Sequence, residues 1–476
     1  MKKILRIAVF FGILTGFSTC TRGLNDDPNS LYSTTPGSLL TYAEKSLSDY
    51  INTPSVNYNN YRLIMQYWQE TTYTDESNYD FTTRNISDRV WSTCYVKVLQ
   101  NLSEAKKNIV GYKPMTNEMA TWEGVKKNQL AIIDLLQVYT YQELVNTFGN
   151  IPYKQALDFS NAALPEYEDA ATIYRDLISR TKADIKNLDV SYKSFDSGEL
   201  LYQGDVNKWR RFANSLLLKL GITLADYDEN LAKSTVQEAI GGGVFRSKEE
   251  ACEFTYYPSS PNFNPLYENL VVSGRNDYVA AKTIVDYMNS TNDERRTKYF
   301  KDNILPYKGG EIGKGSPFSS YTHIGNFAYT ATTPGVLLSY TEVAFYLAEA
   351  GARWGITDAE SGYATAIRAS FTEWGLSESQ ADAYISVRPY DAKNWEKSIG
   401  EEAWVALFNQ GSSSWTMYRR LDYPKLLAPQ SAVVQTVPVR LKYAVRETTT
   451  NPTNYAKASA AIGGDLLSTK LFWDKR

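Results

Sequence analysis

Three stretches of the chain combine aromatic side chains with polar ones, which is a pattern suited to binding a polar ligand. They are residues 58–81, 254–278 and 307–329. A sugar ring or a peptide has an apolar face that packs on an aromatic ring, while nearby amides, carboxylates and guanidinium groups hold its polar atoms. The candidate contacts are the aromatic residues Trp68, Tyr73, Tyr79, Tyr257, Phe263 and Tyr321 and the polar residues Asp75, Asn78 and Arg275. The competing interpretation is that these rings fill gaps between helices.

Catalytic patterns are scarce. GGEIGKGS, residues 309–316, departs from a phosphate-binding loop, because position 308 is lysine and Lys314 is followed by glycine rather than by serine or threonine. His323 is the only histidine, no GxSxG motif is present and no Cys/His ligand spacing occurs. We therefore expect no catalytic residue, no metal and no cofactor. A glycoside hydrolase needs only two carboxylates at a suitable separation, so the sequence leaves that enzyme class open.

The first nineteen residues have the layout of a secretory signal peptide. A basic start is followed by the apolar run Ile7–Phe17 and then by Ser18 and Thr19. The apolar run is too short for a membrane span, which needs about 20 residues. The alternative is a short N-terminal helix buried in the fold.

Cys20 resembles the lipidation site of a bacterial lipoprotein. Phe17 and Thr19 stand where leucine and a small residue are usual, so ordinary cleavage that leaves a free thiol is the alternative. Acyl chains on this cysteine would anchor the protein to a membrane. Residues 20–36 would then form a polar tether, and residues 37–476 a single large domain without an internal Pro-rich or Gly/Ser-rich linker.

Composition narrows the partners. The chain has 50 Lys+Arg against 53 Asp+Glu and no basic block, which argues against a nucleic-acid partner. Cys94 and Cys252 could pair in an oxidising compartment, but two isolated cysteines are more often small buried core residues.

Helical periodicity dominates the chain, and strand signals are few. Asp205 is placed to cap a helix whose apolar residues run from Val206 to Leu224. Leu130–Phe148 is a denser apolar helix that ends at Gly149 and Pro152. Further helices are expected near 37–51, 86–110 and 169–187.

The clearest local unit is a pair of helices between residues 338 and 375. Each helix has one apolar stripe and is followed by a glycine, Gly355 or Gly375. The size and the small alanines match one tetratricopeptide repeat of about 34 residues. The other helices do not keep this period, so a regular solenoid is not expected.

Motifs spread along the chain resemble the SusD/RagB-like outer-membrane lipoproteins of Bacteroidetes, above all the SusD-like branch described as starch-binding and outer-membrane associating. These motifs are LNDDPNS after Cys20, YQELVNTFGNIPYKQAL, WRRFANSLLLKLGITLAD, GRNDYVAAKTIVDYMNSTNDERRTKYF, YTEVAFYLAEA, AIRASFTEWG, WTMYRRLDYP, VPVRLKY, NPTNYAKA and GGDLLSTKLFWDK. One departure is Ala444, where proline is usual, and it loosens one turn.

The resemblance implies a mostly α fold in which four tetratricopeptide-like helical pairs support a loop-rich half. It also implies a lipid-anchored, cell-surface protein of the outer membrane that captures an oligosaccharide or a peptide for uptake. Its partner would be a SusC-like TonB-dependent transporter, whose mouth it covers as a hinged lid, without chemistry on the ligand. Two alternatives stay open: a secreted helical glycoside hydrolase, and a periplasmic repeat scaffold that binds only protein.

Overall fold

Helices make up most of the secondary structure, and local sequence explains where several of them begin and end. The computed structural model describes residues 34–476. Helix α8 (Val206–Thr223) begins after Asp205, whose carboxylate accepts hydrogen bonds from the backbone N–H groups of the next turn. Helix α6 (Trp122–Phe148) ends at Gly149, whose φ of +89° favours glycine. Helix α6 starts eight residues before Leu130, where the apolar run predicted its start. The prediction began too late because the first turns of the helix are mostly polar and carry no apolar pattern.

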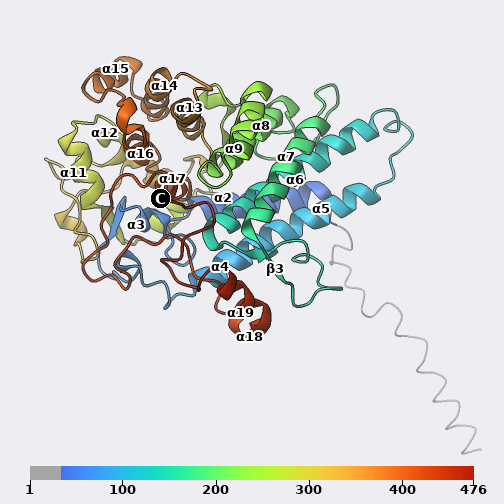
Figure 1. Ribbon diagram of the computed structural model, residues 1–476, viewed down its shortest axis with the longest axis horizontal. Coiled ribbons are helices and arrows are strands. Elements are labelled where there is room, and N and C mark those ends of the chain that lie inside the picture. The colour runs from blue at the N-terminus through green and yellow to red at the C-terminus, as the bar shows by residue number, and fades with distance from the viewer. Residues whose placement is uncertain (1–33) are drawn as a thin grey trace, which may run out of the picture. The chain divides into compact units, whose positions relative to one another are not determined.

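The other helices lie where the periodicity predicts them or in the stretches between. Their bounds are α2 (Pro36–Asn52), α3 (Tyr61–Ile64), α4 (Ile86–Ser92), α5 (Gln100–Gly111), α7 (Ala170–Asn187), α9 (Glu229–Gly242), α10 (Pro265–Tyr267), α11 (Lys282–Ser290), α12 (Arg296–Tyr299), α13 (Tyr340–Trp354), α14 (Ala359–Glu373), α15 (Glu378–Val387), α16 (Trp395–Ala406), α17 (Gly411–Leu421), α18 (Glu447–Thr450) and α19 (Pro452–Ala461). A π-helical segment, η2 (Thr93–Leu99), joins α4 to α5, and Figure 1 labels most of the helices.

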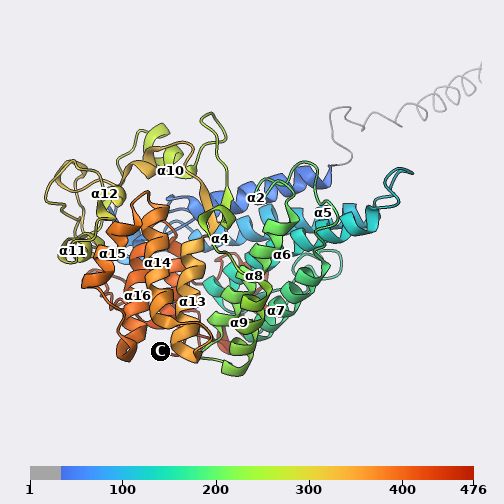
Figure 2. The ribbon, with the colours of Figure 1, turned by 90° about the horizontal axis from the view of Figure 1, so that it is seen from above.

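Consecutive helices pack as pairs, which confirms the predicted two-helix unit. Helix α6 packs on α7, α8 on α9 and α13 on α14, and Figure 2 shows these pairs side by side. In the last pair, a Cβ atom on Gly362 would come within 3.0 Å of Ala348 Cα, so small residues set the close approach of the two helices. The mostly α fold with tetratricopeptide-like pairs is therefore confirmed.

The few strands form three two-stranded antiparallel sheets within residues 34–476. Strand β1 (Trp68–Glu70) pairs with β5 (Tyr278–Ala280), so that Glu70 lies opposite Tyr278. Strand β2 (Ile151–Pro152) pairs with β3 (Tyr167–Glu168), and β4 (Cys252–Phe254) pairs with β6 (Gly335–Leu338). The β1–β5 pair therefore joins the first two aromatic stretches.

One cluster of buried charges in the helical part is paired internally. Arg295 is fully buried, and its guanidinium donates to Asp293 at 2.6 Å and to Glu402 at 3.0 Å. These bonds connect the segment before α12 to α16. Removing one partner would leave an uncompensated charge in the core, which is why such clusters hold elements in a fixed arrangement.

Two expectations concern cysteines. Cys94 and Cys252 are both buried and unpaired, so the structure favours core residues over a disulfide. Burial also raises the pKa of each thiol. Cys20, the signal peptide and most of the tether lie outside the described residues.

Candidate ligand-binding site

All three aromatic stretches meet at the β1–β5 pair. Beyond the strands, the Thr71 backbone N–H donates to Asp277 O at 2.9 Å, and its hydroxyl donates to Asn276 O at 2.7 Å. The third stretch joins from the other edge of β5, where the Gly310 N–H donates to Ala280 O at 2.8 Å. Main-chain bonds between segments far apart in the sequence thus bring the loops together.

A cavity of about 360 Å³ opens where the first two of these stretches meet, and we call it the β1–β5 pocket; no residue of the third stretch lines it. Ligand pockets commonly have volumes of about 300–1,000 Å³. Two predicted residues line it together, Tyr73 with 70% of its surface exposed and Arg275 with 67% of its side chain exposed. The complete lining is Ser55, Val56, Asn57, Glu70, Thr71, Thr72, Tyr73, Arg84, Asn269, Arg275, Asp277 and Tyr278. An exposed ring beside guanidinium and amide groups is the arrangement that a polar ring-shaped ligand needs.

The floor of the β1–β5 pocket holds a carboxyl group with a strongly shifted pKa. Glu70 is buried, and this burial raises its pKa to about 8. Its Oε2 accepts from the Ser77 N–H at 2.8 Å and from the Ser77 hydroxyl at 2.6 Å. At neutral pH the carboxyl is therefore mostly protonated, and its observed bonds close the 70–77 loop.

The two arginines of the β1–β5 pocket differ in how strongly they are held. Arg84 pairs closely with the buried Glu76. Among residues 34–476, Arg275 has only Asp277 as a carboxylate neighbour, at 3.8 Å. Arg275 thus keeps donor capacity for a ligand, because an exposed ion pair at this separation is weak.

Two predicted contacts are wrong, because their side chains lie in the core. Trp68 is 2% exposed; its ring packs on Tyr278, with a centroid separation of 5.4 Å, and under the Arg62 guanidinium. Tyr79 is 0% exposed and receives a hydrogen bond from Gln66 at 3.2 Å. Neither ring presents a face to a ligand.

The Asn78 side chain is already hydrogen-bonded within the protein. Its amide donates to Thr74 O at 2.9 Å and to Gly313 O at 2.8 Å, which ties the first stretch to the third. Asp75 is exposed next to this turn but does not line the β1–β5 pocket.

The remaining candidates lie outside the β1–β5 pocket. Tyr257 is 56% exposed, Phe263 packs against Tyr267, and Tyr321 lies beneath the Lys308 ammonium. Their contact with a ligand stays a prediction.

The sequence does not predict several of the residues that line the β1–β5 pocket. No sequence pattern singles out Arg84, Asn57, Asn269 and Asp277, and only the folded chain brings them together around the β1–β5 pocket. Asp277 follows Arg275 by two residues in GRNDY, and this short polar run was the available signal.

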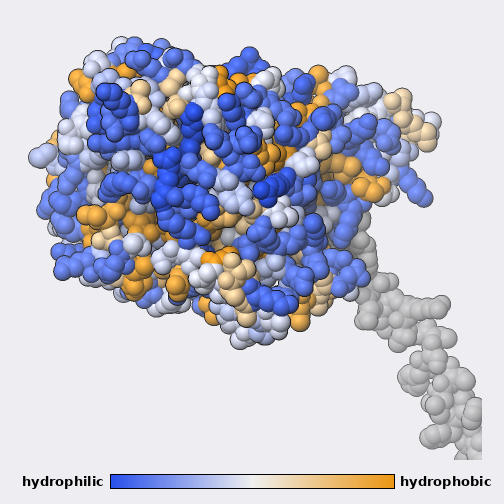
Figure 3. Space-filling view, in the orientation of Figure 1, coloured by the Kyte–Doolittle hydropathy of each residue, from blue (hydrophilic) through white to orange (hydrophobic). Residues whose placement is uncertain are grey.

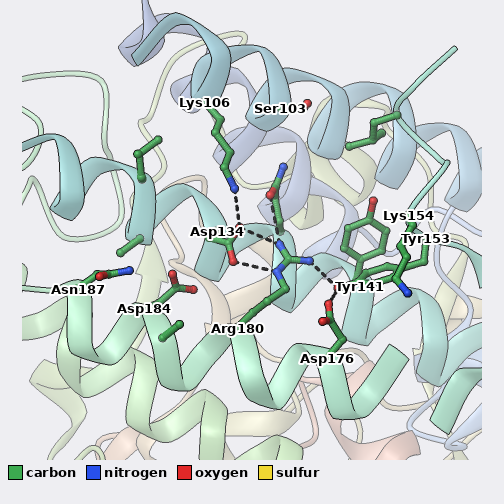
Figure 4. A pocket seen from close by; sticks show the side chains of 15 residues that line it. Ser103, Lys106, Asp134, Tyr141, Tyr153, Lys154, Asp176, Arg180, Asp184 and Asn187 are labelled. Carbon is green, nitrogen blue, oxygen red and sulfur yellow. Dashed lines mark hydrogen bonds and ion pairs between the residues drawn. The ribbon is translucent and has the colours of Figure 1, made fainter. Parts of the chain in front are cut away.

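A second cavity, of about 650 Å³, lies between α5, α6 and α7, and Figure 4 shows its side chains converging from these helices. Its charges pair internally. Asp134 accepts from Lys106 at 3.0 Å and from Arg180 at 2.9 Å, and Arg180 also donates to the Tyr153 hydroxyl at 2.7 Å. Burial and the neighbouring Asp134 raise the pKa of Asp184 to about 9, so this carboxyl is neutral at pH 7. The cavity is therefore close to self-neutralised.

Asp134 was visible in the sequence as a charge within the apolar run of Leu130–Phe148. A charged residue inside such a helix is expected to be paired, because an isolated buried charge is costly. This signal indicates the ion-pair cluster but does not by itself indicate a ligand.

The described residues contain no group of three or more histidine, cysteine, aspartate or glutamate side chains placed to hold a metal ion. Within residues 34–476, no helix is long and apolar enough to cross a bilayer. The face in Figure 3 is largely hydrophilic, with apolar residues in several separate small groups. Fold and site together define a helical-repeat scaffold whose loops carry a polar pocket.

Residues 28–444 match the family model for SusD-like proteins described as starch-binding and associating with the outer membrane, and the chain belongs to this family. No curated protein matches the chain.

Solved structures show the same fold. A chitin-binding protein superposes with a TM-score of 0.80 at 22% identity, over 93% of this chain and 100% of that one. A chitin-binding SusD homolog from Flavobacterium johnsoniae gives 0.77 at 21% identity, over 91% and 98% of the two chains. A SusD homolog from Bacteroides uniformis gives 0.76 at 24% identity, over 92% and 99%.

Proposed function

We propose that this protein is a cell-surface lipoprotein that captures a nutrient, an oligosaccharide or a peptide, in the β1–β5 pocket. The observation that carries the proposal is the meeting of Tyr73 and Arg275, from two distant stretches, in one cavity of about 360 Å³. The family description supports a glycan, and so do the chitin-binding relatives of the same fold.

The proposal includes a membrane anchor and a partner. Acyl chains on Cys20 would hold the protein at the outer membrane, and residues 20–36 would give it slack. A SusC-like TonB-dependent transporter would receive the ligand, with this protein as its hinged lid. The family's association with the outer membrane supports this placement.

The hydrolase alternative has one feature in its favour, a protonated carboxyl in the β1–β5 pocket. A glycoside hydrolase needs such a general acid, together with a second carboxylate. Against this, both hydrogen bonds observed at Glu70 come from Ser77, and the side chain is buried. We therefore propose binding without turnover.

The test is a binding and turnover assay on the soluble form that lacks residues 1–20. Isothermal titration against a panel of glycans and peptides should identify at least one ligand, and chromatography of the same mixtures should show no product. Arg275→Gln should weaken binding of that ligand, by about 5- to 10-fold if one hydrogen bond to an exposed charge is lost. Arg210→Gln is the matched control, because Arg210 is exposed on α8 and lies outside the β1–β5 pocket.

Two outcomes would contradict the proposal. Product formation that disappears in Glu70→Gln would support the hydrolase instead. Protection of the full-length chain from added protease on intact cells, together with recovery of only protein partners, would support the periplasmic scaffold.

A further inference from the structure

Another polar cavity adjoins the β1–β5 pocket, and its residues give it a distinct charge. This cavity, which we call the α4 cavity, has a volume of about 510 Å³ and is lined by Tyr58, Asn85, Asp88, Arg89, Ser92, Thr93, Lys97, Val445, Arg446 and Thr449. Asn57 and Arg84 line the β1–β5 pocket, and the residues that follow them in the chain, Tyr58 and Asn85, line the α4 cavity. Neighbouring residues on two segments of the chain therefore line the two cavities, which places the cavities close together.

The α4 cavity carries three cationic side chains and one carboxylate. The carboxylate, Asp88, is already occupied by backbone groups. Its Oδ2 accepts from the Val445 N–H at 2.9 Å, and its Oδ1 accepts from the Arg446 N–H at 3.0 Å. These bonds fasten the segment before α18 to α4, two elements that Figure 1 shows next to each other. Asp88 thus serves the fold, and its single negative charge is outnumbered by the three cationic side chains of the α4 cavity.

The cations are left without partners of their own. Arg89 and Lys97 have no carboxylate within ion-pair distance among residues 34–476, and Arg446 reaches only Asp88, at 3.8 Å. The cavity of Figure 4 is the opposite case, because Lys106 and Arg180 there share Asp134. In a chain whose formal net charge is −3, the α4 cavity is a local excess of positive charge.

The helix geometry spreads these cations along one line. Arg89 lies on α4 and Lys97 on η2, eight residues apart, or about 12 Å along a helix axis. Segments with π-helical geometry occur often at functional sites. The Arg89 guanidinium also lies 5.4 Å from the Tyr58 ring centroid, so a ring platform accompanies the charge.

We propose that the α4 cavity binds an anionic substituent, a carboxylate or a sulfate ester, of a glycan that extends from the β1–β5 pocket, so that the captured nutrient is an acidic glycan. This inference rests on the proposed function. Arg89 and Lys97 would hold the anionic group, and the Tyr58 and Tyr73 rings would pack on sugar rings on either side of the boundary. Arginine forms bidentate bonds with planar anions, and lysine acts as a point charge.

The test compares matched probes on the soluble form that lacks residues 1–20. An oligogalacturonate supplies carboxylates, its methyl-esterified form supplies the same backbone without charge, and a chondroitin sulfate oligosaccharide adds sulfate esters. We expect at least one acidic probe to bind tenfold or more tightly than the esterified one, with affinity that falls as salt rises. Arg89→Gln and Lys97→Gln should each weaken this binding by about tenfold, because each removes a charged hydrogen-bond donor.

Arg210→Gln is the matched control. Arg210 is exposed on α8 and lines a different cavity beside α9, so this variant removes the same charge elsewhere. Binding should be unchanged in it. Arg89→Lys should retain more affinity than Arg89→Gln, because it keeps the charge but not the fork of donors.

The outcomes separate this inference from the proposed function. Equal affinity for charged and esterified probes, or acidic binding that is indifferent to Arg89 and Lys97, overturns the acidic-glycan assignment and leaves capture in the β1–β5 pocket standing. Binding of poly-glutamate with the same dependence on Arg89 and Lys97, and of no acidic glycan, assigns the α4 cavity to an acidic peptide and overturns the glycan class. Binding of no glycan or peptide overturns both proposals.

Discussion

Trp68 and Tyr73 lie five residues apart, and their substitution by alanine should have opposite effects. Trp68 is 2% exposed and packs on Tyr278, whereas Tyr73 is 70% exposed at the β1–β5 pocket. Trp68→Ala should lower the free energy of unfolding by about 3–5 kcal/mol, because it removes a buried ring and leaves a cavity. Tyr73→Ala should change it by less than about 0.5 kcal/mol, since the side chain is largely in water.

The expected shift in melting temperature follows from the size of the folded unit. The unit spans Pro36–Arg476, and at about 2 cal/mol/K per residue its unfolding entropy is about 0.9 kcal/mol/K. A loss of 3–5 kcal/mol therefore lowers the Tm by about 3–5 °C. For Tyr73→Ala we expect an unchanged Tm and a loss of 1–3 kcal/mol in binding, about 5- to 150-fold in Kd, if the ring is a platform for the ligand.

Differential scanning calorimetry and isothermal titration at 25 °C measure the two effects separately. Tyr42→Ala, 50% exposed on α2 and outside the β1–β5 pocket, is the control for loss of a surface ring. An unchanged Tm in Trp68→Ala together with lost binding would refute the assignment of Trp68 to the core. A lowered Tm with unchanged affinity in Tyr73→Ala would move the ligand away from the β1–β5 pocket.

Three further predictions concern titratable and reactive groups. The pKa of Glu70 is raised to about 8, so the protein loses stability as the pH rises from about 4.5 towards 8. Urea unfolding at pH 5 and pH 8 should show this loss in the free energy of unfolding, at most about 1.4 kcal/mol per pH unit, and Glu70→Gln should remove it. The same pH dependence in both proteins would count against the reasoning. In the form that lacks residues 1–20, Cys94 and Cys252 should not react with Ellman's reagent in the folded protein, and both should react in denaturant. If neither cysteine reacts in denaturant without reductant, the two form a disulfide. Full-length Cys20→Ala, in cells without the transporter, should leave the membrane fraction on washing, and its retention there would exclude a lipid anchor at this residue.

The sequence predicts the helices well because their signals are local. Asp205 and the apolar spacing after it define α8, and the glycine at 355 ends α13 in a left-handed conformation. Such signals involve residues within one or two helical turns of each other, so one sequence is enough to detect them.

The site is harder to predict because it depends on contacts between distant segments. Tyr73 and Trp68 have the same local signature, an aromatic residue in a polar stretch, yet Trp68 lies in β1 and packs on Tyr278, whereas Tyr73 lies in the loop after the strand and is exposed. The unpaired charges of Arg89 and Lys97 depend in the same way on the backbone bonds that occupy Asp88.

Helix α2 determines how the folded unit would respond to a mechanical load applied at its N-terminal end. The Thr41 hydroxyl donates to Gly198 O at 2.7 Å, the Glu44 carboxylate accepts from the Leu200 N–H at 2.7 Å, and the Ser48 hydroxyl bonds to the Tyr256 hydroxyl at 3.0 Å. A force along the axis of this helix therefore acts on these three hydrogen bonds at the same time, in shear, and does not break them one after another. Tension applied at Pro36 would therefore pass through α2 to the segments around Gly198, Leu200 and Tyr256, and would not first unravel the helix from its end.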